Sequence, residues 1–447
     1  MKKHAIFLFT FCLSLTINAR DWDTYPIPAT AGSGMEWQLQ ENISDEFNYN
    51  FEAATTLTTF NNRWKNFYHN SWNGPGTTYW QYNHVAVDGS NLLIKSSRNT
   101  STSKMSVPGV NAGCITSTNR VKYPVFIEAN VSVANITLAS DVWLLSADDT
   151  QEIDMIECYG GAENGNSYFA QFIHLSHHSF IRSPFKDYQP QDLNSWWKKS
   201  GVSSWGAYCW NNGVRKYLRI GVNWIGPKHF EYYVDGDLVR VLYENAFATR
   251  INGTWTYSYP SMSNGVLNFS GGYQSVITYA ANSNAYSFAT LQAASNLSTT
   301  SVIDPYNYQG GAGFTKELDI IINMESQDWH VTAGRTPTDA ELANPDKNTL
   351  KVDWIRVYKP VSNTAVNMIE DKTLQVYPNP CGQHVNIKSK QIIKQIQLCQ
   401  LNGAIIKKTT VGSVSQTLEL DDLATGLYFL KIESEDGNWT IKKIIKA

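Results

Sequence analysis

Three carboxylates fall within six residues of the stretch EIDMIECYGG, at Glu152, Asp154 and Glu157. Apolar residues separate them, which predicts a β-strand with one apolar face. In a regular strand the side chains alternate between faces, so Glu152 and Asp154 would share a face and Glu157 would point away. Closely spaced carboxylates raise one another's pKa, and proteins accept that cost mostly at functional sites. We therefore expect a site here, although acidic runs elsewhere usually form a solvated surface.

A β-bulge would bring the three acids into one site. One extra residue at Met155–Ile156 returns Glu157 to the face of Glu152 and Asp154. Two carboxyl groups about 5–5.5 Å apart can hydrolyse a glycosidic bond with retention of configuration, one as the nucleophile and one as the acid/base. A third acid between them can hold a proton and keep the two roles distinct. The spacing thus predicts a bulged strand whose acids line one cleft.

The region around this stretch, from Trp37 to about Tyr358, is strand-like almost throughout. Segments such as RKYLRIGVNWI (215–225) and TLKVDWIRVYK (349–359) alternate apolar and polar residues or carry β-branched runs, with turn residues between them. So many strands predict an all-β fold, with a β-sandwich or jelly roll as one domain over residues 21–360.

Residues 249–310 differ in composition from the strands around them. They are rich in Ser, Asn, Thr, Tyr and Gly, and Arg250 and Asp304 are their only charged residues. A disordered linker would carry fewer aromatic residues. We predict a folded insertion between two core strands, which either walls a cleft or covers a sheet edge.

The N-terminus and the composition favour an exported protein. Residues 1–20 combine two lysines, a short apolar run and Ala19, which is typical of a cleaved signal peptide. No run is long and apolar enough to span a membrane. A net charge of −3 with 17% charged residues gives no case for binding nucleic acid. The 15 Trp and 24 Tyr suit a cleft that stacks neutral sugar rings, or a β-rich core packed with aromatic residues.

The composition changes again after residues 361–372, which we interpret as a linker. The last part of the chain contains VYPNP (376–380), GLYFLKI (426–432) and a basic end, KKIIKA. These motifs predict a small separate β-sandwich over residues 373–447. They resemble the C-terminal sorting domain of proteins exported by the type IX secretion system of Bacteroidetes. The resemblance implies secretion, the type IX machinery as a partner, and no part in the chemistry.

The order E-I-D-M-I-E resembles the active-site signature of glycoside hydrolase family 16 in its bulged E-x-D-x-x-E form. The resemblance implies a jelly-roll catalytic domain that works without a cofactor. It extends over much of residues 21–360 and is similar to the β-agarase branch, whose members hydrolyse agarose. The segments that carry it include MEWQLQENISDEFNY (35–49), SWNGPGTTYW (71–80), HLSHHSFIRSPFKDYQP (174–190) and VDWIRVYKP (352–360).

Carried over by position, the resemblance implies a role for each of the three acids. Glu152 would be the nucleophile, Glu157 the acid/base, and Asp154 an assisting carboxylate between them. It also implies that Trp143 is a sugar platform and that Trp72 belongs to a loop over the negative subsites. Trp143 could instead be core packing.

Three further side chains match or lie near positions that bind substrate in agarases. Arg182 and Glu325 match contact positions, although Arg182 could be a structural salt-bridge partner and Glu325 a rim charge. His178 would line the cleft or support another group there. His178 lies near His174 and His177, but no carboxylate spacing supports a metal at these histidines.

Members of the family often hold a structural calcium on the convex side, far from the catalytic acids. Asp21, beside the predicted mature N-terminus, and Asp353, in the last predicted strand, occupy matching places. Calcium prefers such oxygen ligands. Free surface acids explain both residues equally well.

The segment SADDTQ before Glu152 bears on the choice of polysaccharide. It carries Asp148 and Asp149 and no Arg or Lys, whereas porphyranases of the family have an arginine about there. Sulfated galactans need cations that meet the sulfate, and two acids in place of the arginine would repel it. We therefore expect endo-acting, retaining cleavage of β-1,4 galactosidic bonds in neutral agarose, with β-porphyranase or another sulfated-galactan hydrolase as the alternative. A non-catalytic jelly-roll carbohydrate-binding protein is a third hypothesis, but it would not need three acids.

Overall fold

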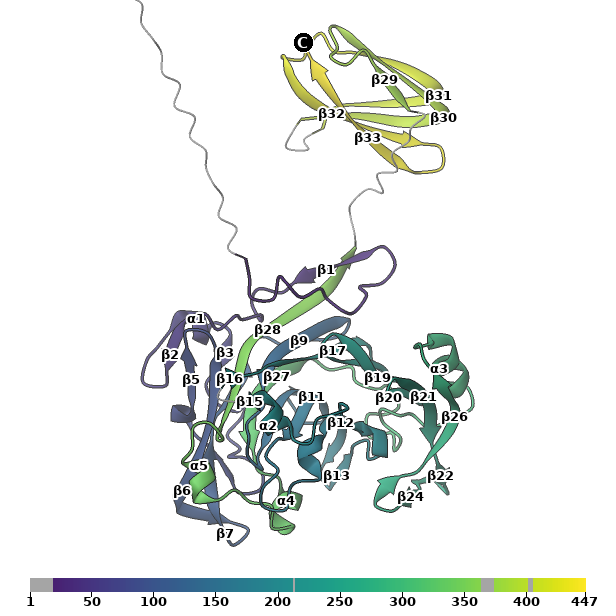
Figure 1. Cartoon of the computed structure of the whole chain (residues 1–447). Coiled ribbons are helices and arrows are strands. Elements are labelled where there is room, and N and C mark those ends of the chain that lie inside the picture. Colours follow the sequence, from purple (N-terminus) through teal and green to yellow (C-terminus); the bar gives the residue numbers. More distant parts are fainter. Residues whose placement is uncertain (1–18, 212–213, 363–373, 401–404) are drawn as a thin grey trace, which may run out of the picture. The chain divides into compact units, whose positions relative to one another are not determined.

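The structure is a computed structural model that describes residues 19–211, 214–362, 374–400 and 405–447 (Figure 1). Contacts divide the chain into two compact units, one that contains Trp37–Pro360 and one that contains Val361–Ala447, with Ser33–Glu36 assigned to the second. Most of the predicted signal peptide and linker lies outside the described residues. None of the described helices is long and apolar enough to cross a membrane.

The larger unit is built around a sheet of fourteen strands. Three of these strands, β1 (Met35–Leu39), β4 (Thr78–Trp80) and β7 (Val107–Ala112), pair beside its main path. In spatial order the main path is β2 (Asn50–Glu52), β5 (Val85–Asp88), β6 (Leu92–Lys104), β28 (Thr349–Ser362), β9 (Val125–Ser132), β17 (Leu218–Gly226), β18 (His229–Val234), β19 (Asp237–Tyr243), β20 (Ala246–Ile251), β21 (Thr254–Pro260) and β26 (Val276–Ser283).

A second sheet of eight strands packs against the first and carries the three acids on β11. One buried apolar cluster contains residues of both sheets, for example Ile153 of β11 and Val222 of β17, so the unit is a two-layer sandwich. In spatial order the second sheet is β13 (Phe185–Tyr188), β12 (Ile173–Arg182), β11 (Gln151–Tyr159), β10 (Ala139–Ser146), β27 (Leu318–Glu325), β8 (Cys114–Ser117) and β3 (Trp64–Lys65), with β14 (Trp196–Trp197) paired to β12.

Short elements connect the strands of the larger unit. Strands β15 and β16 pair with each other, as do β22 with β23 and β24 with β25. Their bounds and those of the helical turns are β15 (Trp210–Asn211), β16 (Val214–Arg215), β22 (Met262–Ser263), β23 (Val266–Leu267), β24 (Phe269–Ser270), β25 (Tyr273–Gln274), α1 (Thr58–Asn61), α2 (Trp205–Cys209), α3 (Phe288–Ser295), α4 (Asp328–Thr332), α5 (Asp339–Leu342), η1 (Tyr82–His84), η2 (Phe169–Gln171) and η3 (Leu193–Ser195).

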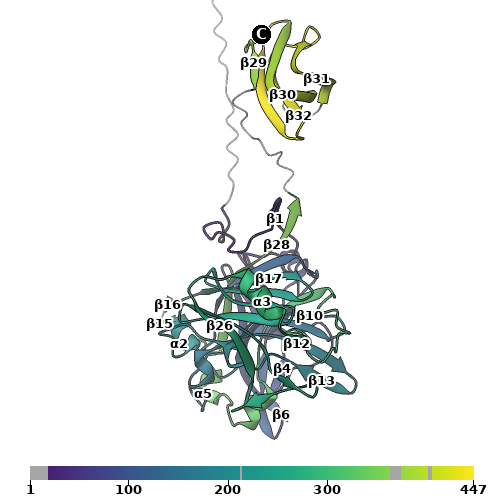
Figure 2. The ribbon, with the colours of Figure 1, turned by 90° about the vertical axis from the view of Figure 1, so that its right-hand side faces the viewer.

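The segment predicted as an insertion extends the edge of the large sheet. Strands β21 and β26 continue the sheet beyond β20, and α3 packs beside them (Figures 1 and 2). Trp255, Tyr257 and Leu291 belong to a separate small core there. The β24–β25 hairpin also reaches the loops of the second sheet, since the Gln274 backbone N–H donates to the Gln191 carbonyl at 3.0 Å. The insertion therefore covers a sheet edge, and its β24–β25 hairpin contacts the loop between β13 and η3.

The C-terminal unit is a single five-stranded sheet with its own buried core. Its strands are β29 (Gln375–Tyr377), β30 (His384–Cys399), β31 (Ile405–Glu419), β32 (Gly426–Ser434) and β33 (Trp439–Lys446). The long strand β30 pairs with β29 through 386–388 and with β32 through 393–399. Buried residues from both halves of β30, such as Ile387 and Leu398, share one core. This bent sheet is the form that the predicted small β-sandwich takes.

Candidate active site

The predicted bulge is present in β11. Against β10, Val142 is opposite Ile156 and Trp143 is opposite Asp154, which leaves Met155 without a partner. Against β12 the register also shifts between Asp154 and Glu157. Met155 and Ile156 both lie in the core between the sheets. The extra residue therefore brings all three acids onto the face away from the core, as the spacing predicts.

Directly opposite residues of antiparallel strands share a face, so the register defines the surface around the acids. Each acid belongs to a row of side chains that crosses the strands. The rows are His178, Glu152, Leu145 and Asp319; then Ser176, Asp154, Trp143 and Ile321; then His174, Glu157, Asp141 and Asn323. Glu325 is opposite Ala139, in the next row. The structure thus brings the predicted residues Trp143, His178 and Glu325 onto the face of the three acids.

Glu157 has two hydrogen-bond donors. The Nδ1 atom of His174 lies 2.8 Å from one carboxylate oxygen, and the Tyr159 hydroxyl donates to the other. The His174 ring stacks on Trp196 at 4.2 Å between centroids, which fixes its orientation. Burial alone would raise the pKa of Glu157, but the His174 and Tyr159 bonds lower it by more.

Glu152 and Asp154 share a histidine. The Nε2 atom of His178 lies 3.7 Å from an oxygen of each acid, and its Nδ1 atom lies 2.9 Å from Asp187. Burial lowers the pKa of His178, but Asp187 and Glu152 raise it well above its ordinary value. Burial raises the pKa of Glu152 well above its usual range and that of Asp154 to about 6. The protonation of Glu152 and of Asp154 therefore depends on the charge of His178.

In the described part of the chain, Glu152, Asp154 and His178 form the one group of three or more acidic, His or Cys side chains whose ligand atoms all lie within 4.8 Å of one another. The pairing of His178 with Asp187 favours the protonated ring, which cannot bind a metal. The predicted calcium ligands Asp21 and Asp353 are outside this group. Their side chains accept hydrogen bonds from Asn48 (2.8 Å) and Asn130 (2.9 Å), respectively.

Asn323 holds three groups of the site together. Its side-chain oxygen accepts from the Trp143 indole N–H at 2.6 Å, and its amide nitrogen donates to Asp141 at 3.1 Å and to Glu325 at 3.0 Å. Trp143 is only 8% exposed and packs against Tyr68, so it belongs to a small core as well as to the face of the acids. Burial, and then the charge of Glu157, raise the pKa of Glu325 to about 8. Glu325 is thus a buried acid and not a rim charge.

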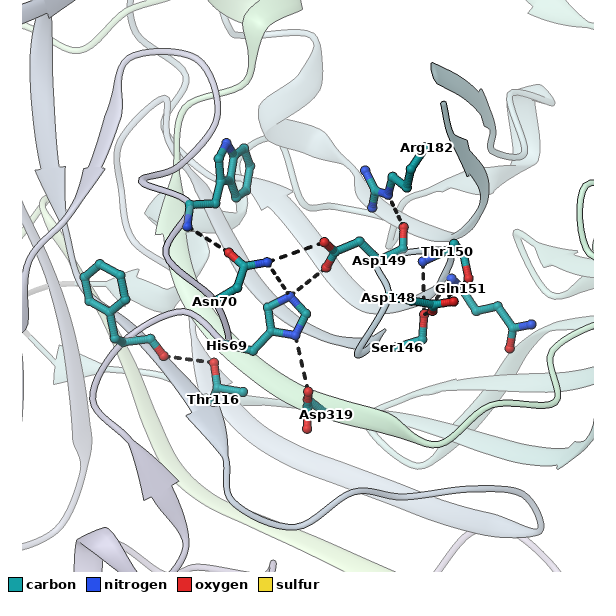
Figure 3. Close-up of polar contacts among 12 residues, drawn as sticks. His69, Asn70, Thr116, Ser146, Asp148, Asp149, Thr150, Gln151, Arg182 and Asp319 are labelled. Atoms are coloured by element: carbon teal, nitrogen blue, oxygen red, sulfur yellow. Dashed lines mark hydrogen bonds and ion pairs between the residues drawn. The ribbon is translucent and has the colours of Figure 1, made fainter. Parts of the chain in front are cut away.

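Trp72 and Arg182 lie at the edge of this face. Trp72 is 44% exposed, and its ring lies 5.3 Å from that of Tyr68. The Nε atom of Arg182 donates to the Asp149 carbonyl (Figure 3). Its guanidinium lies 4.1 Å from the centre of the Phe180 ring. Arg182 is therefore held by a bond to a backbone carbonyl and by a contact with an aromatic ring, and not by the salt bridge that was the alternative.

The two acids of SADDTQ are paired. Asp148 forms an ion pair with Lys316, and Asp149 lies 2.6 Å from the Nε2 atom of His69. The prediction that both acids would repel sulfate assumed free charges. Because each has a basic partner, their electrostatic repulsion of a sulfate is weaker than the sequence suggested.

Several residues of the site were not predicted. Asp141 is 4% exposed and precedes Trp143 by two positions on β10, and Asn323 precedes Glu325 by two positions on β27. The period-two rule for strands could have found both, because it places them on the face of the predicted residues. Tyr159 follows Glu157 by two positions and could have been found in the same way.

Comparisons with known proteins identify the family. The model described as β-porphyranase A–D, GH16 domain, matches residues 37–259. β-Agarase D of Zobellia galactanivorans is 45% identical, over 95% of this chain and 95% of that protein. The chain belongs to glycoside hydrolase family 16. The expected enzyme class and the resemblance to the family are therefore confirmed.

A further relative and a solved structure support the same assignment. A β-agarase of Phocaeicola plebeius is 40% identical, over 78% of this chain and 97% of that protein. The crystal structure of the catalytic domain of β-agarase D from Zobellia galactanivorans is 51% identical over 77% of this chain and all of that chain, with a TM-score of 0.70. This neighbour confirms the predicted jelly roll. A secretion system C-terminal sorting domain model matches residues 375–447, which confirms the predicted sorting domain and secretion.

Proposed function

We propose that this family 16 enzyme is an endo-acting β-agarase that cleaves β-1,4 galactosidic bonds with retention of configuration. The observation that carries the proposal is the bulge at Met155, which places Glu152, Asp154 and Glu157 on one face. The curated relatives named β-agarases support agarose as the substrate. So does the solved structure of an inactivated mutant β-agarase B in complex with agaro-octaose, which is 38% identical over 76% of this chain and all of that chain, with a TM-score of 0.57.

The proposed reaction has two steps. Glu157 protonates the leaving oxygen while Glu152 attacks the anomeric carbon to form a glycosyl-enzyme. Water then attacks this intermediate, with Glu157 as the base that takes its proton. Trp143 supports the sugar ring beside Asp154, in an orientation set by Asn323.

These roles require a proton on Glu157 and a charge on Glu152 when the bond breaks. The bonds from His174 and Tyr159 favour the ionised form of Glu157, whereas burial favours the neutral form of Glu152. A proton must therefore reach Glu157 as the sugar binds. Asp154 lies between the two acids and has a pKa of about 6, so it is the group placed to pass the proton of Glu152 to Glu157. The charge of His178 then stabilises the ionised nucleophile.

A β-porphyranase is the second candidate, because the matching family model carries that description. A sulfated galactan needs a cation that faces the sulfate. Arg182 and Lys316 are cations bound to the turn before Glu152, but the Nε atom of Arg182 already donates to the Asp149 carbonyl, and Lys316 is paired with Asp148. These contacts favour agarose over porphyran.

Sugar release by the purified protein tests the proposal. We expect reducing ends from agarose, much slower release from porphyran, and none from either polymer with Glu152→Gln. Faster release from porphyran would make the protein a porphyranase. If the wild type and Glu152→Gln both bind agarose and neither releases sugar, the protein is a carbohydrate-binding protein. That result would overturn the proposal that it is an enzyme.

We also propose that residues 373–447 address the protein to the type IX secretion machinery, and that Asp21 and Asp353 hold a structural calcium. The match to a sorting-domain model supports the first proposal. For the second, the residues offer hard oxygen ligands, and burial together with the charge of Asp21 raises the pKa of Asp353. A divalent cation would relieve that repulsion.

A further inference from the structure

His69 is a buried histidine beside the active site that none of the catalytic steps uses. It lies in the segment between β3 and β4, three residues before Trp72, and its side chain is 7% exposed. Its two ring nitrogens face two carboxylates (Figure 3). The Nε2 atom is 2.6 Å from Asp149, and the Nδ1 atom is 3.3 Å from Asp319.

The two carboxylates come from elements that carry the catalytic face. Asp149 is in the turn between β10 and β11, three residues before Glu152, and Asp319 is on β27 in the row of Glu152. His69 therefore joins the segment that bears Trp72 to the strands that bear the catalytic acids.

Asn70 extends this link to Trp72. Its side-chain oxygen accepts from the Trp72 backbone N–H at 2.8 Å, and its amide nitrogen donates to Asp149 at 3.4 Å. The ring of Tyr68 contacts both the His69 ring, at 4.6 Å between centroids, and the Trp72 ring, at 5.3 Å. Asp149 is thus contacted by His69 and Asn70 together, and the exposed Trp72 follows directly in the chain.

The turn that presents Asp149 is itself fixed. Asp149 has a φ of 57°, in the left-handed region that non-glycine residues rarely adopt. Its backbone N–H donates to the Ser146 carbonyl at 2.9 Å, and its carbonyl accepts from Arg182. Its carboxylate therefore has a defined direction, toward His69.

We propose that His69 is a positioning residue that clamps the Trp72 segment onto the turn before Glu152 and so sets the affinity for the galactan chain. This inference rests on the proposed agarase function, because it needs Trp72 to stack on substrate. The clamp acts on binding and not on bond cleavage, since His69 touches none of Glu152, Asp154 and Glu157.

The charges around His69 favour the protonated form of its imidazole ring. Asp149 and Asp319 face its ring, Arg120 lies 2.9 Å from the other oxygen of Asp319, and Lys65 donates to the His69 carbonyl. Burial lowers the pKa of His69, but its two carboxylate partners raise it above the ordinary value. Deprotonation removes the attraction that holds the segment, so the KM for agarose should rise at alkaline pH.

Steady-state kinetics on agarose test the clamp with His69→Ala, Trp72→Ala and the double variant. We expect each single change to raise KM about tenfold with kcat within about twofold of wild type, as for loss of uniform binding. The double variant should resemble Trp72→Ala, because His69 acts through Trp72. His84→Ala is the matched control, since His84 contacts Asn83 and Ser97 and neither clamp acid. It should leave KM unchanged.

The alkaline rise of KM should be absent in His69→Ala. If His69→Ala fails to fold, Asp149→Asn, which weakens the same contact, should show the same rise in KM. The clamp would be overturned if KM were unchanged in both His69→Ala and Asp149→Asn. It would also be overturned if the effects of His69→Ala and Trp72→Ala on KM multiplied in the double variant. A wild-type protein that releases no sugar from agarose would refute the proposed function instead.

Discussion

Each carboxylate of the active site has a different set of partners, and these partners set its protonation. Glu157 has two donors, whereas one oxygen of Asp154 is buried without a hydrogen-bond partner. The pKa of Asp154 is therefore raised to about 6 and that of Glu157 is lowered. The catalytic pair thus depends on Asp154 for its proton.

We predict an alkaline limb in the pH profile of kcat/KM that belongs to Asp154. As the pH rises through about 6, Asp154 loses the proton that it passes to Glu157. Asp154→Asn should remove this limb and lower kcat roughly 10²-fold, a typical loss for acid–base catalysis. An Asp154→Asn enzyme with the wild-type limb would show that another group is responsible.

The three acids could be recognised from the sequence because their residue types and spacing are unusual. Asp141 and Asn323 were missed, although strand periodicity places them beside predicted residues. His174 and His69 could not be assigned in this way. Strand register places His174 beside Glu157. The loop that carries His69 places it between Asp149 and Asp319. Local sequence defines neither of these arrangements.

At the scale of elements, the bulge in β11 brings the three acids onto one face of the sheet. A carboxylate pair on opposite faces of a strand cannot act on one bond. The bulge could be predicted because a single functional face required it. Helix α3 and the short hairpins of the insertion were not predicted. The packing of α3 on β20 and β21 is tertiary, so local sequence does not define it.

Deleting Met155 tests the bulge. The strand should become regular, so Glu157 turns toward the core, and we expect loss of activity and a lower Tm because a buried acid loses its partners. Deletion of Ile225, the extra residue where the β17–β18 register shifts, is the matched control. It should keep activity. Wild-type rates after deletion of Met155 would contradict the assigned geometry.

At the scale of the whole molecule, the catalytic unit and the sorting unit have separate cores. Composition was enough to predict this division, because Lys and Ile rise and Trp falls after the linker. The buried acids of the active site also affect the stability of the catalytic unit.

We predict that Glu325 makes the enzyme less stable as the pH rises from 6.5 to 8. The pKa of Glu325 is about 8 in the folded chain and about 4.3 in the unfolded chain, so the folded chain binds more protons in this window. The free energy of unfolding then falls by about 1 kcal/mol per pH unit from this group and levels off above pH 8. Thermal melts of Glu325→Gln should show a shallower decline. If the Tm of the wild type and that of Glu325→Gln fell in parallel with pH, the raised pKa of Glu325 would be refuted.

The proposed calcium is tested by melting the protein with Ca²⁺ and after chelation. Ca²⁺ should raise Tm by several degrees, because it binds the folded chain only. Asp353→Asn should abolish the shift, whereas Asp237→Asn, which changes an exposed acid on β19, should retain it. Equal Tm values with and without Ca²⁺ would leave Asp21 and Asp353 as surface acids.

The stereochemistry of the first product tests the central claim most directly, because only a nucleophile and an acid/base acting on one bond give retention. Proton NMR during the first minutes of agarose hydrolysis should show the β-anomer of the new reducing end, followed by slow mutarotation. The α-anomer as the first product would contradict Glu152 as nucleophile and the two-step mechanism built on the bulged strand.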